Sequence, residues 1–237
     1  MEKLGVDVCQ IILEMLDLKS QIRMISTCKY FWYNLKIYKL HSDNLTNEIL
    51  KYHIFKHVTD LNILFNKKVT DLNHMTNLKK LNINKAYKVN QAGIANLNLI
   101  ELSASCNSKI TDLNHMTNLK TLCAYGSCGV RQAGIRKLNL IKLNLNYNTN
   151  ITDLNHMTNL EELHAAYNCG INQSSIVNLN LIELHADDNP KINSVTHMTN
   201  LKTLHASYNS GIDQAGITGL NLIELSAIDN SNIITKI

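Results

Sequence analysis

The segment Val69-Thr-Asp-Leu-Asn-His-Met-Thr-Asn-Leu78 decides the fold, because it returns almost unchanged at Ile110 and again at Ile151. A diverged copy starts at Ile192 and a shortened one at Ile233, so each step along the chain is 41 residues. A unit of this size cannot bury its own apolar face and has to stack on its neighbours. The sequence therefore predicts a solenoid.

Each 41-residue unit contains two similar halves of 20 and 21 residues, with the pattern L-x-x-L-x-φ-x-x-N-x-x-φ, where φ is apolar. In nine successive halves the first position is Val58, Leu78, Leu99, Leu119, Leu140, Leu160, Leu181, Leu201 and Leu222. Apolar residues at positions four and six predict a short strand with one buried face. We expect an α/β solenoid of about nine coils over residues 58–237, whose strands form one parallel sheet.

The ninth position is asparagine in seven coils: Asn66, Asn107, Asn148, Asn168, Asn189, Asn209 and Asn230. The backbone leaves the strand here, and an inward amide both donates and accepts hydrogen bonds, which would satisfy polar groups of adjacent coils. We therefore predict a buried asparagine ladder. Ala86 and Ser127, the two exceptions, are predicted weak points.

This pattern resembles the leucine-rich-repeat family in its short-repeat form, from about residue 58 to the C-terminus. The resemblance implies a concave parallel sheet that recognises proteins. One departure is alanine at the sixth position, where the family usually has leucine, in six coils: Ala104, Ala124, Ala165, Ala186, Ala206 and Ala227. We expect a thin core there, filled by Met and Ile residues of the return path.

Residues before Val58 lack the repeat and show helical periodicity instead. Val8, Ile11, Ile12 and Met15 follow i, i+3, i+4 and i+7, which predicts an amphipathic helix.

A second helix is expected to begin at Lys19 or Ser20, a third to cover the aromatic segment 29–35, and a fourth to run from about Asp43 to Phe55. The predicted domains are a helical domain over 1–41, a connecting and capping helix within 42–57, and the solenoid over 58–237.

Residues 4–35 contain Leu4-Gly-Val-Asp-Val8, Ile12-Leu13, Leu16-Asp-Leu-Lys19 and Cys28-Lys-Tyr-Phe31-Trp32 in this order. The order resembles an F-box, whose motif has a Leu-Pro start, an Ile-Leu pair, a Leu-Asp-Leu segment and a Val-Cys-Lys/Arg-x-aromatic end. Gly5 stands where Pro is usual, and Thr27 where Val is common. An F-box followed by leucine-rich repeats is a known architecture, and the Asn- and Ile-rich composition is similar to such proteins of giant DNA viruses of amoebae.

The resemblance implies a non-catalytic, monomeric adaptor that joins a Skp1-type adaptor and a cullin ubiquitin ligase to an unknown target protein. A viral origin would place it in the host cell cytoplasm. The residues that would divide between the helical core and the adaptor interface are Leu4, Val8, Ile12, Leu16, Ile22, Ile25 and Phe31. The alternative is a stand-alone repeat module that binds or sequesters a protein, with the helical domain serving only as a cap.

The target is expected on the outward face of the strands. His164, His185 and His205 occupy the fifth position of three consecutive coils, which places them about 5 Å apart. The other residues that we assign to target binding are Tyr125, Tyr147, Tyr167, Asp187 and Tyr208. The histidines fit a protein-binding hot spot, exposed copies left by duplication, or a metal site, against which their in-line arrangement counts. If they bind a target, binding should weaken below about pH 6.5.

Composition argues against several other functions. The net charge is +4, and the two parts divided at residue 57 each carry about +2, which gives no basic stripe for nucleic acid. The six cysteines form no Cys-x-x-Cys pair, as expected of free thiols inside a cell, and no apolar run reaches the length of a membrane span. Catalytic and phosphate-binding motifs are missing from the sequence, so we expect no enzyme, cofactor or resident metal.

Overall fold

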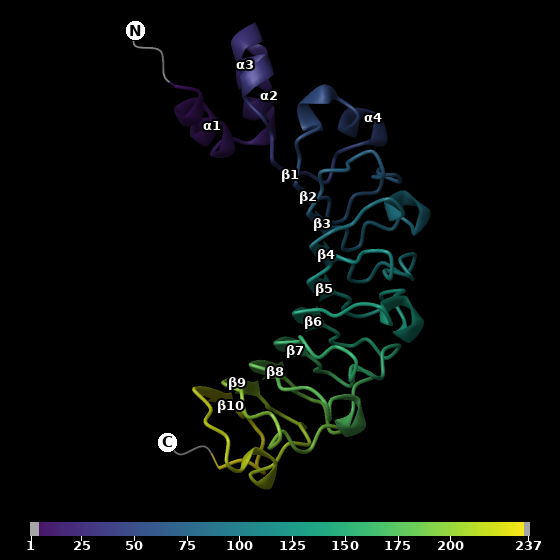
Figure 1. The fold of residues 1–237 in the computed structure, drawn as a ribbon, viewed down its shortest axis with the longest axis vertical. Coiled ribbons are helices and arrows are strands. Elements are labelled where there is room, and N and C mark those ends of the chain that lie inside the picture. The colour runs from purple at the N-terminus through teal and green to yellow at the C-terminus, as the bar shows by residue number, and fades with distance from the viewer. Residues whose placement is uncertain (1–4, 235–237) are drawn as a thin grey trace. The chain divides into compact units, whose positions relative to one another are not determined.

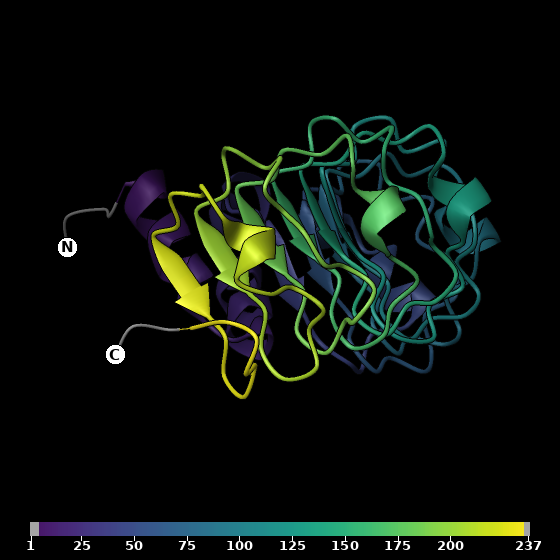
Figure 2. The same cartoon turned by 90° about the horizontal axis from the view of Figure 1, so that it is seen from below.

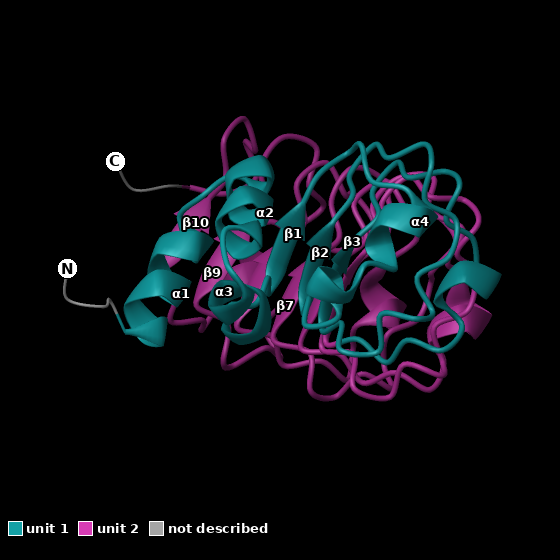
Figure 3. Ribbon diagram, turned by 90° about the horizontal axis from the view of Figure 1, so that it is seen from above, with its two compact units in different colours: residues 1–99 teal, residues 100–237 magenta. Residues whose placement is uncertain are grey.

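The computed structural model describes residues 5–234, which form two compact units divided between Leu99 and Ile100 (Figures 1 and 3). Leu4, one of the residues expected at the adaptor interface, lies outside the described residues. Within the described part of the chain, no helix is long and apolar enough to cross a membrane.

Unit 1 begins with three short helices, α1 (Val6–Glu14), α2 (Leu18–Ser26) and α3 (Lys29–Asn34). Helix α2 begins one to two residues earlier than predicted, because Asp17 is its N-cap. The Asp17 carboxylate accepts a hydrogen bond from the backbone N–H of Ser20 at 2.9 Å, which satisfies one of the free donors of the first turn.

The strand ladder of unit 1 starts before the predicted repeat. Strand β1 (Lys39–His41) pairs in parallel with β2 (Asp60–Asn62), and β2 pairs with β3 (Lys80–Asn82). Ile37 and Leu40 are each 1 % exposed and take the places that Val58 and Leu61 hold one coil later. The strand therefore lies inside the segment expected to be wholly helical, and an additional coil precedes residue 58.

The prediction of a long helix from about Asp43 to Phe55 is wrong. Only α4 (Asn47–Leu50) and the 3₁₀ turn His53–Phe55 are helical here. The segment is the return path of the additional coil, which has to bend repeatedly to bring Leu50 and Phe55 back into the core, where each is 2 % exposed.

Unit 2 carries a parallel sheet whose described strands follow the order of the chain (Figure 2). They are β4 (Glu101–Ser103), β5 (Thr121–Cys123), β6 (Lys142–Asn144), β7 (Glu162–His164), β8 (Glu183–His185), β9 (Thr203–His205) and β10 (Glu224–Ser226). Neighbours pair residue for residue, so that Leu143, Leu163 and Leu184 lie opposite one another. This repeated parallel pairing confirms the predicted solenoid architecture.

The return paths alternate in structure along the chain. One kind contains a 3₁₀ turn: Ala92–Ile94 in unit 1, and Gln132–Ile135, Gln173–Ser175 and Ala215–Ile217 in unit 2. The other kind buries Met116, Met157 and Met198, each 0 % exposed. Coils with alanine at the sixth position occur with both kinds of return path, because Ala104 shares its coil with Met116 and Ala124 shares its coil with Ile135.

A left-handed residue follows each of the strands β2 to β10, at the eighth position of the repeat. These residues are Phe65, Lys85, Cys106, Gly126, Tyr147, Tyr167, Asp188, Tyr208 and Asp229, with φ between 52° and 67°. For residues other than Gly, Asn and Asp this conformation costs about 1–2 kcal/mol. Most coils therefore hold a strained corner that their packing stabilises.

Buried asparagines at the ninth position bind the preceding coil, as predicted. Asn66 Nδ2 donates to the carbonyls of Asp43 and Leu45, at 2.8 and 2.9 Å. Asn148 Nδ2 donates to the carbonyl of Ala124 at 2.9 Å, and Asn189 and Asn230 repeat the arrangement in their coils.

The same prediction is wrong for Asn168 and Asn209, which are exposed. The inward places in these coils belong to Cys169 and Ser210, which are buried. A glycine follows each of them, and a Cβ on Gly170 would lie 2.2 Å from the carbonyl oxygen of Ile151. The backbone at this glycine therefore packs closely against the preceding coil and leaves space only for a small inward side chain.

Ser127 is likewise exposed, and Cys128 is the buried residue at this corner, with Gly129 behind it. The predicted weakness at Ser127 consequently has no structural basis. From residue 107 onwards, Asn corners alternate with Cys-Gly or Ser-Gly corners, and this alternation gives the repeat its 41-residue period.

Candidate functional site

The residues His164, His185 and His205, here called the histidine row, lie side by side in unit 2. They end strands β7, β8 and β9 and are paired in register across the sheet. Their rings stack, with centroids 4.0 Å apart at 7° between His164 and His185, and 4.1 Å apart at 12° between His185 and His205. The predicted adjacency of the three side chains is confirmed.

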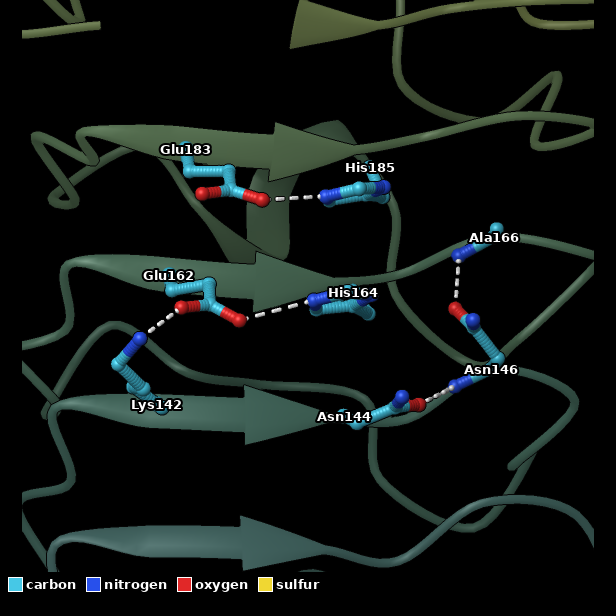
Figure 4. Close-up of polar contacts among 8 residues, drawn as sticks. All are labelled: Lys142, Asn144, Asn146, Glu162, His164, Ala166, Glu183 and His185. Atoms are coloured by element: carbon cyan, nitrogen blue, oxygen red, sulfur yellow. Dashed lines mark hydrogen bonds and ion pairs between the residues drawn. The ribbon is translucent and has the colours of Figure 1, made fainter. Parts of the chain in front are cut away.

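A carboxylate holds each of the first two rings. Glu162 and Glu183 lie two residues before His164 and His185, on the same face of the strand (Figure 4). The Nε2–H of His164 donates to Glu162 Oε1 at 3.0 Å, and that of His185 donates to Glu183 Oε1 at 2.6 Å. His205 Nε2 lies 3.8 Å from Glu224 Oε1 on the next strand.

Lys142 extends this network to strand β6. Its Nζ forms an ion pair with Glu162, so that Glu162 joins a lysine and a histidine (Figure 4). Lys142 was not among the residues predicted from the sequence, although its place at the third position of the preceding coil, opposite Glu162, was the available signal.

Two pKa values in the network depart from their ordinary range. Burial lowers the pKa of His185, and the neighbouring His164 and His205 lower it further, against the opposing effect of Glu183. Burial alone would raise the pKa of Glu162, but the hydrogen bonds from Lys142 and His164 outweigh it and lower the pKa. The central ring of the histidine row is therefore kept neutral at pH 7, with an ionised carboxylate beside the row.

A group of tyrosines lies next to the histidine row. The Tyr125 and Tyr147 rings meet edge to face at 5.4 Å, and Tyr147 stacks on Tyr167 at 4.7 Å and 10°. Tyr208 is 47 % exposed, two coils beyond Tyr167. Burial, followed by the nearby charge of Asp187, raises the pKa of Tyr167. The tyrosines combine a hydroxyl group with a flat apolar ring, which suits protein recognition.

The side chain at the seventh position of the repeat forms a hydrogen bond with the next coil at the edge of this surface. Asn146 Oδ1 accepts a hydrogen bond from the backbone N–H of Ala166 at 2.9 Å (Figure 4). Asp187 Oδ1 accepts one from the N–H of Ser207 at 2.8 Å. Asp187 is thereby held in place beside the histidine row.

The helical domain presents a second candidate surface, in unit 1. Of the residues assigned to it from the sequence, Ile25 is 1 % exposed and belongs to the core. Val8, Ile12 and Ile22 are 44, 38 and 36 % exposed. Leu16 and Phe31 are half-buried.

Two further residues of this surface, Ile11 and Met15, were not assigned to it from the sequence and are 61 and 82 % exposed. They belong to the same helical stripe as Val8 and Ile12, and α1 packs on the rest of the unit through Cys9 and Leu13 instead.

The sequence matches no protein-family model and no curated protein.

Proposed function

We propose that this chain is a non-catalytic recognition adaptor, the substrate-recognition subunit of a Skp1–cullin–F-box type ubiquitin ligase. Helices α1–α3 would dock the Skp1-type adaptor, and the outward strand face of a leucine-rich-repeat solenoid would hold the target protein. The proposal places the chain in the cytoplasm, because these partners are intracellular.

The observation that carries the proposal is the uncovered apolar stripe of α1. A lone amphipathic helix normally turns its apolar stripe to the core. Here Val8, Ile11, Ile12 and Met15 face outward, although burying one such side chain is worth about 1.5–3 kcal/mol. A contiguous exposed apolar patch on a small domain marks an interaction site.

Unit 1 also exposes an apolar residue on α2. Ile22 of α2 is exposed and also lines an apolar groove with Leu18, Ile49, Tyr52 and Ile54. A partner helix of matching apolar character would fit beside α2. This arrangement supports docking by the helical domain better than a role as a simple cap, which would bury its apolar residues against the first coil.

The target-binding part of the proposal rests on unit 2. The histidine row and the tyrosines present flat rings on short, rigid strands, and Glu162, Glu183 and Asp187 surround them with carboxylates. Rigid aromatic anchors with polar partners are typical of the centre of protein–protein interfaces. The negative charge favours a basic segment of the target.

The test is co-purification of the full chain with a Skp1-type adaptor. The wild type should retain the adaptor at micromolar concentration, and Ile12→Asp and Ile22→Asp should abolish retention. Ile182→Asp is the matched control, because Ile182 is 44 % exposed in unit 2, outside the helical surface, against 38 % for Ile12. Circular dichroism should show that all variants are folded. Failure of the wild type to retain the adaptor refutes the ligase role and leaves a stand-alone binding module.

A further inference from the structure

His185 is shared by two groups of potential metal ligands within the described residues. One group is His164, Glu183 and His185, and the other is His185, Asp187 and His205. In each group the candidate ligand atoms lie within 4.8 Å of one another. A straight row of three histidines offers poor tetrahedral closure, but a carboxylate displaced from the row supplies the ligand that the histidines alone lack.

We propose that His185, Asp187 and His205 bind one divalent transition-metal ion of the zinc, nickel or copper class. Imidazole nitrogens and a carboxylate oxygen together favour these ions over magnesium or calcium, which prefer oxygen ligands alone. Three protein ligands leave at least one coordination position for water or for a group of another molecule.

The hydrogen bonds of the row favour this group over the one that contains Glu183. The Nε2–H of His185 already donates to Glu183, so the nitrogen available to a metal is on the opposite side of the ring (Figure 4). Glu224, on the next strand, lies 3.8 Å from His205 Nε2, beyond hydrogen-bond distance. The hydrogen bond to Glu183 fixes the tautomer of His185 and raises the basicity of its ring, and metal-binding histidines commonly have such a partner.

Asp187 is suited to be the third ligand. The N–H of Ser207 binds its Oδ1 at 2.8 Å, which orients the carboxylate without neutralising its charge. Two neutral imidazoles and one carboxylate would give a divalent ion a net charge of about +1.

Binding requires one movement. A metal–nitrogen bond lies in the plane of the imidazole, whereas the rings of His185 and His205 are stacked at 12°. At Zn–N distances of about 2.0–2.1 Å, tetrahedral ligand atoms are about 3.3 Å apart, so at least one ring has to turn about its Cβ–Cγ bond. Both side chains border solvent, with 19 and 27 % exposure, which leaves room for this rotation.

The test is isothermal titration of zinc chloride into the full, tag-free chain after chelator treatment, at about pH 7.5, where imidazole is neutral. We expect one ion per chain with micromolar affinity or better. His185→Gln and Asp187→Asn should each weaken binding at least about tenfold, and Glu183→Gln should also weaken it, as expected of a supporting carboxylate. Cobalt in place of zinc should give visible absorption bands that the same variants lose.

His197→Gln is the matched control. His197 lies on a return path of the same unit, with Nε2 3.2 Å from the carbonyl oxygen of Ile176, and this variant should keep the wild-type affinity. Asp187→Asn alters no buried packing and keeps the test valid if a histidine variant fails to fold. The proposal is overturned if the wild type binds no zinc at micromolar concentration, or if Asp187→Asn or His185→Gln binds it as the wild type does. Neither result depends on whether α1–α3 dock a ligase.

Discussion

Replacing Asn189 by alanine tests whether the buried amides hold successive coils together. Asn189 is fully buried, and its Nδ2 donates to the carbonyls of Ala165 at 2.7 Å and Ile171 at 3.2 Å. Its Oδ1 accepts a hydrogen bond from the N–H of Lys191 at 3.1 Å. Alanine removes these bonds, together with a longer one from Nδ2 to Cys169 Sγ at 3.7 Å, and adds no polar group in their place.

The expected loss of stability is about 3 kcal/mol. Each buried polar group left without a partner costs about 1–3 kcal/mol, and water entering the vacated space recovers part of this. Asn209 has the same place in the sequence repeat but is exposed, and only its backbone N–H forms a hydrogen bond, to Asp188 at 3.3 Å. Asn209→Ala should therefore change the stability by no more than about 0.5 kcal/mol.

The assay is urea unfolding followed by circular dichroism, with midpoint and slope compared because solenoids can unfold in parts. For a chain of this size, about 3 kcal/mol corresponds to a fall in Tm of roughly 6–12 °C. Equal midpoints for Asn189→Ala and Asn209→Ala would refute the assignment of Asn189 as the inward residue and Asn209 as the outward one.

Three further predictions concern the histidine row, the left-handed corners and the buried thiols. Burial lowers the pKa of His185 below 6.5, so the unfolded chain is protonated at a higher pH than the folded chain. The stability that the neutral ring contributes is therefore lost as the pH falls through the folded pKa. Urea midpoints measured between about pH 7.5 and 5.5 should fall less steeply in His185→Gln than in the wild type. Tyr208→Asn should raise the free energy of unfolding by about 1 kcal/mol, since asparagine tolerates the φ of 59° better than tyrosine, and a lower urea midpoint would contradict this. Burial raises the pKa of Cys128 to about 11, so Cys128 should react with a disulfide reagent at about pH 8 far more slowly than the exposed Cys28, and equal rates would show that the corner opens.

The sequence predicted the sheet well, because the solenoid pairs equivalent residues of successive coils. Once Leu143, Leu163 and Leu184 are aligned by their repeats, residue-for-residue stacking places His164 beside His185 without further information. The Asn corners that follow the same rule, such as Asn189, were predicted for the same reason.

The predictions from the sequence were wrong where the structure depends on how the backbone packs against the preceding coil, or on which face of a helix points to the core. The exposed Asn168 differs locally from a buried Asn in the Cys169-Gly170 pair that follows it, and the effect of this pair depends on the close approach of Gly170 to the preceding coil, which the sequence pattern alone does not show. The additional first coil was missed because Ser42 and Leu45 replace the apolar sixth and Asn ninth positions. Periodicity shows that α1 is amphipathic, but it does not show whether its stripe faces the core or solvent.

The period of the repeat bears on the origin of the histidine row. Copying a 41-residue unit relates His164 to His205, and this pair alone needs no functional explanation. His185 belongs to the other half of the unit, where the equivalent residues 41 positions away are Asn144 and Ser226.

Asp187 departs from its equivalents in the same way, since Asn146 and Ile228 hold its place in the neighbouring units. Duplication therefore accounts for the outer two rings but not for the central histidine or the carboxylate beside it. His185 and Asp187 are the two residues that convert a pair of separated histidines into a continuous, charged site, which argues against the histidine row as a passive product of repetition.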